Sequence, residues 1–210
     1  MNAVTTPVVT TVRDAIQSGG RGKVFTSKDF LDVGSRDAID QALSRLTRGG
    51  DIKRIGRGLY YYPRMNHRLG ISLSPDADDV AQALARQTGT RIAPSGAVAA
   101  NKLGLTTQVP GRLVYLTDGY SRQVKAAGLE FSFRRVAPKD FPPGAEASAL
   151  VFQALRYVGR EAVTDEVLRR LKSSLPARVR KKLLGDARYI TGWVHELVRW
   201  LADDHAEKRH

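Results

Sequence analysis

Residues 26–63 decide the fold of this chain, and their sequence is TSKDFLDVGSRDAIDQALSRLTRGGDIKRIGRGLYYYP. Within this stretch, four apolar residues recur at the i, i+3, i+4 and i+7 spacing of one helical face: Ile39, Ala42, Leu43 and Leu46. Ser35 can cap the start of this helix through its side-chain oxygen, and Gly49 can end it after Arg48. The pattern therefore predicts an amphipathic helix from Ser35 to about Arg48.

The residues around this helix predict a compact three-helix module with a β-hairpin. Thr26 and Ser27 can cap a short preceding helix, which ends at the Val33-Gly34 turn. After the second helix, two β-prone runs, 52–55 and 59–62, flank Gly56-Arg57-Gly58, whose glycines permit a tight turn. Residues 7–18 supply a third amphipathic helix at the N-terminus. This order of elements is typical of a winged helix-turn-helix.

The outward side of this module is polar and basic. At about 100° per residue, the side of the 35–48 helix opposite its apolar stripe presents groups that can reach base edges or phosphates. The hairpin adds cations that can lie along a DNA backbone. The DNA-binding residues predicted from this arrangement are Gln41, Ser44, Arg45, Arg48, Lys53, Arg54 and Arg57. Among them, Gln41, Ser44 and Arg48 are the predicted base contacts, and Lys53, Arg54 and Arg57 the predicted phosphate contacts.

Composition points to a protein of the cytoplasm with a polyanionic partner. The 210 residues hold 34 Lys and Arg against 21 Asp and Glu, a formal charge of +13, which favours phosphate binding. Cysteine is absent, so disulfides and cysteine-based zinc sites are excluded. The N-terminus lacks a signal-peptide pattern, and no run approaches the roughly 20 apolar residues of a membrane span. We therefore expect a cytoplasmic protein without a membrane partner.

The rest of the chain predicts a second domain. Residues 66–74 are polar and weakly periodic and are expected to link a winged-helix domain (1–65) to a C-terminal domain (75–210). Within the latter, 75–145 predict an α/β part with a small antiparallel sheet, and 146–202 predict a helical bundle. The predicted strands are 112–117, 123–126 and 129–136, and the predicted last helices are 146–158, 163–174, 176–187 and 189–202. The fold class is therefore α+β.

No pattern in the sequence predicts enzymatic or metal chemistry. The four histidines, at 67, 195, 205 and 210, lack metal-ligand spacing. Ser95 lies in Pro-Ser-Gly-Ala rather than in a nucleophile motif, and acidic residues at 76–79 suit a helix start. We expect no catalytic residue, no metal and no cofactor. A second basic contact is predicted at Arg178, Arg180, Lys181 and Lys182, with a solvated helix face as the alternative.

Three motifs taken together carry a family resemblance. They are RGLYYYP at 57–63, RIAPSGAVAANKLGLTTQVPGRLVYLTDGYSR at 91–122 and SALVFQALRYVG at 148–159. In this order they resemble the AbiEi-type antitoxins of type IV toxin-antitoxin systems, in their short subgroup with a winged helix. The resemblance covers about residues 7–201.

What the resemblance implies is a bacterial antitoxin that represses its own operon. The winged helix would bind inverted repeats in the promoter, and the resemblance implies that Arg36 takes part in this together with the DNA-binding residues named above. The C-terminal domain would oppose a nucleotidyltransferase toxin encoded beside it. A stable complex with the toxin is not required in such systems. The expected state is a monomer in solution that binds DNA cooperatively.

Two other functions fit the same residues. A one-component transcriptional regulator would sense a small ligand with the C-terminal domain, and the ligand would release operator DNA. An RNA-binding protein acting on tRNA would use the basic C-terminal half and could stack bases on Tyr60, Tyr61 or Tyr62.

Overall fold

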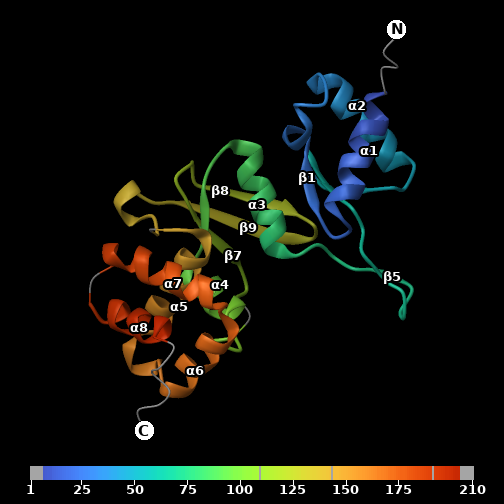
Figure 1. The fold of residues 1–210 in the computed structure, drawn as a ribbon. Coiled ribbons are helices and arrows are strands. Elements are labelled where there is room, and N and C mark those ends of the chain that lie inside the picture. Colours follow the sequence, from blue (N-terminus) through green and yellow to red (C-terminus); the bar gives the residue numbers. More distant parts are fainter. Residues whose placement is uncertain (1–6, 109, 143, 191, 204–210) are drawn as a thin grey trace. The chain divides into compact units, whose positions relative to one another are not determined.

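Three helical segments and a small antiparallel sheet form the core of the first part of the chain (Figure 1). The computed structural model describes residues 7–108, 110–142, 144–190 and 192–203. The helical segments are α1 (Val8–Gly19), the 3₁₀ turn η1 (Ser27–Phe30) and α2 (Arg36–Arg48). The strands, in their spatial order, are β1 (Val24–Thr26), β3 (Leu59–Tyr61) and β2 (Lys53–Gly56).

The predicted pattern of α2 is confirmed. Its four apolar residues are buried, Ile39 and Leu43 completely, and the Ser35 hydroxyl accepts the Ala38 N–H. The predicted short helix before it is a single 3₁₀ turn, in which Asp29 accepts the Thr26 N–H at 2.8 Å. The elements of a winged helix-turn-helix are thus present in the expected order, and the assignment to that class stays a prediction.

Both faces of the three-stranded sheet are covered. Tyr60 and Tyr62 pack with the core of α1, η1 and α2. Tyr61 points to the opposite face, as strand alternation requires, and is only 2 % exposed. Helix α3 (Ala77–Thr88) packs against β1, so the face that carries Tyr61 is covered as well.

The first compact unit extends well beyond the predicted 1–65 domain. It contains residues 1–91 together with 123–131, so α3 belongs to it. The predicted linker contains a short hairpin of β4 (Met65–Asn66) and β5 (Ile71–Ser72). Compactness therefore places the division after α3, whereas the sequence predicted it at 66–74. Whether the chain can be divided into independently folding pieces at 66–74 stays a prediction.

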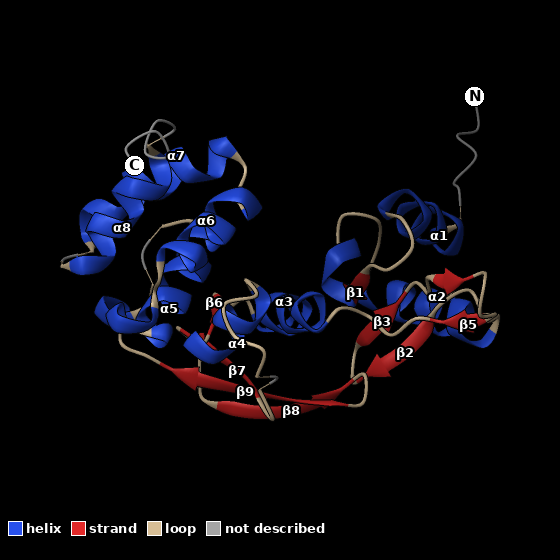
Figure 2. Ribbon diagram, turned by 90° about the horizontal axis from the view of Figure 1, so that it is seen from below, coloured by secondary structure: helices blue, strands red, loops and turns tan. Residues whose placement is uncertain are grey.

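The second unit consists of residues 92–122 and 132–210. A four-stranded sheet contributes to it, with β6 (Ile92–Pro94), β7 (Leu113–Thr117), β9 (Leu129–Arg135) and β8 (Arg122–Ala126) in spatial order. The predicted sheet had three strands, and β6 adds the fourth by pairing antiparallel with β7. Strands β8 and β9 form a hairpin (Figure 2), whose end at 123–131 belongs to the first unit.

Helices make up the rest of the second unit. They are α4 (Gly96–Lys102), α5 (Glu146–Val158), α6 (Asp165–Ser174), α7 (Ala177–Asp186) and α8 (Trp193–Ala202). The last four bury an apolar core that includes Phe152, Leu171 and Val198. Helix α8 begins later than predicted, because Gly192 has a positive φ of 79° and so lies outside the helix. The fold class is α+β, with small antiparallel sheets and a helical C-terminal part.

Candidate nucleic-acid interface

The solvent-facing side of α2 gathers the predicted base-contacting residues. Gln41, Ser44 and Arg48 are exposed, and they line one surface hollow of about 520 Å³. The complete lining of this hollow is Asp37, Asp40, Gln41, Ser44, Arg45 and Arg48. Hydroxyl, amide, guanidinium and carboxylate groups therefore converge on one concave surface, and these are the groups that bind base edges in a major groove.

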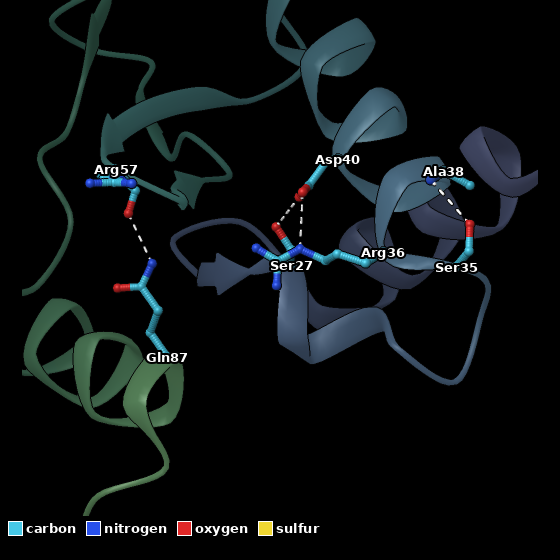
Figure 3. A network of polar contacts seen from close by, with 7 residues as sticks. All are labelled: Ser27, Ser35, Arg36, Ala38, Asp40, Arg57 and Gln87. Atoms are coloured by element: carbon cyan, nitrogen blue, oxygen red, sulfur yellow. Dashed lines mark hydrogen bonds and ion pairs between the residues drawn. The ribbon is translucent and has the colours of Figure 1, made fainter.

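Asp40, which lines this hollow, links α2 to η1. Its carboxylate accepts a hydrogen bond from the Ser27 hydroxyl of η1 and one at 2.9 Å from the Arg36 Nε–H of its own helix (Figure 3). Because one carboxylate joins the two helical segments, it holds the turn between them. Arg36, a predicted DNA contact, is consequently engaged in an ion pair with Asp40.

The wing hairpin, residues 53–61, does not present its three predicted phosphate contacts on one side. Lys53 pairs with Tyr61 across the hairpin, and Arg54 pairs with Tyr60. Because successive side chains in a strand point to opposite faces, Lys53 and Arg54 leave the sheet in opposite directions. Both are exposed, as is Arg57 in the turn.

Helix α3 supports the turn of the wing hairpin. The Gln87 side-chain amide donates to the Arg57 carbonyl at 2.9 Å (Figure 3). Gly58 has φ +65°, and a Cβ at this position would lie 2.7 Å from the Gln87 nitrogen. The turn therefore requires glycine both for its backbone conformation and for the approach of Gln87.

The turn between β8 and β9 contacts the wing hairpin at β2. The Ala127 N–H donates to the Ile55 carbonyl at 2.7 Å, and a Cβ at Gly56 would lie 3.3 Å from the Ala126 methyl group. Sequence reasoning missed Gln87 and Ala127 as supports of the hairpin. No local pattern marks either residue, since both act on a segment far away along the chain.

The predicted second basic contact on α7 divides into two kinds of residue. Arg178, Lys181 and Lys182 are exposed and recur at helical spacing on one face. Arg180 instead donates its Nη1–H groups to the carbonyls of Lys172 and Leu175. These carbonyls belong to the end of α6, so Arg180 caps that helix.

The three consecutive tyrosines do not form an open stacking surface. Tyr60 is 9 % exposed and Tyr61 is 2 % exposed. The ring of Tyr62 is half-buried and lies 4.7 Å from the Arg21 guanidinium carbon. Arg21 also donates to the Pro63 carbonyl at 2.9 Å. The tyrosines are therefore used for packing, and base stacking on Tyr60 or Tyr61 would require them to leave the core.

The fold perturbs the ionisation of Asp186, a carboxylate of the second unit. Burial raises its pKa, but hydrogen bonds from the Ser148 hydroxyl and the Ala145 amide lower it, as do the charges of Lys182 and Arg188. The net effect is a lowered pKa. Both hydrogen-bond donors lie at the start of α5, so Asp186 holds the N-terminal end of that helix.

The described ranges were compared with what a metal site and a membrane span require. No three His, Asp or Glu side chains gather there in an arrangement suited to a metal ion; His205 and His210 lie outside these ranges. None of the helices described by the structure is both long enough and apolar enough to cross a bilayer.

Residues 11–183 of the chain match a protein family that is described as "Family of unknown function (DUF6088)". None of the curated proteins compared with the chain matches it.

Proposed function

We propose a DNA-binding, transcription-repressing function for this chain, which belongs to the family of unknown function DUF6088. One observation carries the proposal: Gln41, Ser44, Arg45 and Arg48 meet in one exposed hollow on α2. Amide and guanidinium groups can each form paired hydrogen bonds with adenine or guanine in the major groove. The helix that presents them is held by Asp40, so the groups are positioned before DNA arrives.

The wing hairpin adds the sequence-independent part of binding. Lys53, Arg54 and Arg57 are exposed cations, and phosphate neutralisation releases counterions from DNA. Because Gln87 and Ala127 hold this hairpin by hydrogen bonds, it can approach the backbone without first paying the entropy of ordering a loop.

The biological role that we propose follows the resemblance to AbiEi-type antitoxins. The chain would bind inverted repeats in its own promoter as a monomer that associates cooperatively on DNA, and so repress its operon. Its second unit would counteract a nucleotidyltransferase toxin encoded beside it, with no stable complex required. The three motifs at 57–63, 91–122 and 148–159 support this part of the proposal.

A binding experiment tests the DNA part. The full chain is titrated into labelled duplexes that carry its own promoter or a shuffled promoter, and into a structured RNA, all at the same salt concentration. We expect the promoter duplex to bind more tightly than both competitors. Equal affinity for promoter and shuffled DNA would contradict the proposal, and preference for RNA would favour the tRNA-binding alternative.

A growth experiment tests the antitoxin part. The neighbouring open reading frame is expressed in a bacterial host with and without this chain. We expect the neighbour alone to stop growth and this chain to restore it. A harmless neighbour, or a toxic one that this chain does not counteract, would contradict the antitoxin role while leaving DNA binding to be judged by the first experiment.

A further inference from the structure

A second, smaller hairpin follows the wing hairpin directly along the chain. In this 64–73 hairpin, Met65 pairs with Ser72 and Asn66 pairs with Ile71. The Asn66 side-chain oxygen accepts the backbone N–H groups of Arg68 and Leu69, at 3.1 and 3.2 Å. These bonds close the tip, so Arg68 and Leu69 are held on a formed turn.

Tyr61 ties the base of the 64–73 hairpin to the sheet. Its hydroxyl donates to the Leu73 carbonyl at 3.0 Å and accepts the Arg64 N–H at 3.4 Å. The Leu73 N–H also donates to the Arg64 carbonyl at 2.8 Å. Since Tyr61 is a residue of β3, the hairpin is anchored to the strand that forms one side of the wing hairpin.

The surface of the 64–73 hairpin combines exposed apolar side chains with positive charge. Met65, Leu69 and Ile71 are 37 %, 63 % and 52 % exposed, and Arg64 and Arg68 are exposed beside them. No acidic residue occurs anywhere between Asp51 and Asp76. Exposed apolar groups on a formed structure mark an interaction surface, and the one-sided charge selects a polyanion as its partner.

The position of the 64–73 hairpin connects it to the wing hairpin. A hollow of about 430 Å³ is lined by Met65 and Ser72 from the 64–73 hairpin and by Lys53 from the wing hairpin. Arg21 lines the same hollow, as does Arg13, which is paired with Asp51 at 3.5 Å. Cationic side chains therefore continue from the predicted phosphate contact at Lys53 to the base of the 64–73 hairpin, within one compact unit.

We infer that the 64–73 hairpin is a second DNA-contacting element, which enters the minor groove beside the site bound by α2 and the wing hairpin. Arg64 and Arg68 bind the phosphates at the groove edges, and Leu69 at the tip makes apolar contact inside the groove. Proteins that bind the minor groove use this combination of arginines with an apolar wedge. The inference rests on the proposed DNA-binding function.

Charge removal at the 64–73 hairpin tests the inference. The full chain with Arg64→Ala and Arg68→Ala is compared with wild type and with Arg156→Ala plus Arg169→Ala, which removes the same charge from exposed positions of the second unit. Promoter affinity is measured between about 50 and 200 mM salt. We expect the hairpin variant to bind more weakly and to lower the slope of log K against log salt by about two, and the control to match wild type.

A second pair of variants separates the contribution of apolar contact and hairpin anchoring from the contribution of charge. Leu69→Ser should weaken promoter binding several-fold without changing the salt slope, because it removes an apolar contact and no charge. Tyr61→Phe should also weaken binding, because it frees the hairpin base while keeping the ring in the core. Circular dichroism melting verifies that both variants remain folded.

The failures of the two proposals are distinguishable. If wild type binds its promoter specifically and Arg48→Ala lowers that binding, while the hairpin variants equal the matched control, the inference is wrong and the proposed function stands. The full chain could also bind anionic vesicles of phosphatidylserine and phosphatidylcholine. Loss of that binding in the hairpin variants, with their DNA affinity unchanged, would also overturn the inference. If wild type does not prefer its promoter, both proposals fail.

Discussion

Arginines that the sequence predicts as nucleic-acid contacts have different surroundings in this chain. Arg180 donates to two carbonyls at the end of α6, and Arg36 is paired with Asp40. Arg48, by contrast, is exposed in the hollow on α2. A guanidinium can cap a helix, bind a carboxylate or bind a base. The role of an arginine in a motif can therefore be assigned only when its surroundings are known.

Replacing Arg48 and replacing Arg57 should have different consequences for DNA binding. Arg48→Ala should reduce the preference for promoter over shuffled DNA by about 1–3 kcal/mol, because it removes a base contact, whereas Arg57→Ala should weaken all duplexes alike and lower the salt slope by about one. Salt titrations on both duplexes measure this. Equal effects of the two substitutions on both duplexes would contradict the assigned roles.

The stability of the second unit should decline in acid partly through Asp186. The pKa of Asp186 is lowered in the folded chain. Its contribution to stability is therefore fully present above the unfolded pKa, which is about 3.9 for aspartate. That contribution is lost as the pH falls through the lower pKa of the folded chain. Urea unfolding of wild type and Asp186→Asn should therefore differ near neutral pH and converge below about pH 4. Parallel pH profiles for the two proteins would rule out this role of Asp186.

Small residues set the distance between two helices of the second unit. Ala99 and Ala100 of α4 and Ala154 of α5 are completely buried together. A Cβ at Gly96 would lie 2.5 Å from the Tyr157 Cβ and 3.2 Å from the Gln153 carbonyl oxygen. The small side chains of α4 therefore allow the two helices to approach closely.

Gly96→Ala should destabilise the protein, because the added methyl group must push α4 and α5 apart. Overpacking of this kind costs about 1–3 kcal/mol. Gly185→Ala is the matched control, since a Cβ there meets nothing within 4 Å, and it should leave stability unchanged or raise it by up to about 1 kcal/mol. Chemical denaturation measures both. A Gly96→Ala protein as stable as wild type would show that the two helices can yield.

The first compact unit depends on a helix that the sequence assigned elsewhere. Val24 and Tyr61 pair in register and point to the sheet face that carries α3. Arg86 of α3 donates to the Val24 carbonyl at 3.1 Å and is paired with Asp29. These contacts join α3 to β1 and η1, so the helix is part of the first compact unit and supports the wing hairpin through Gln87.

A fragment of residues 1–65 should therefore fold poorly compared with a fragment of residues 1–91. Without α3, the buried side chains of Val24, Leu59 and Tyr61 would face water, and exposed apolar surface costs about 25 cal/mol per Å². Thermal melting by circular dichroism and amide dispersion in NMR spectra compare the two. Cooperative unfolding of the shorter fragment, equal to that of the longer one, would restore the predicted boundary at 66–74.

The sequence by itself determined most of the helices and the strands β2, β3, β7, β8 and β9, because their signals are local. Ser35 and Gly49 delimit α2, and the spacing of its apolar residues specifies the face that is buried and hence the outward face with Gln41, Ser44 and Arg48. Only the tertiary structure decided that Arg180 caps α6, that Tyr61 anchors the 64–73 hairpin, and that α3 supports the wing hairpin. The physical reason is that each of these outcomes depends on hydrogen bonds and packing between side chains and backbone groups of different elements. Neither propensity nor periodicity along the chain encodes which elements meet.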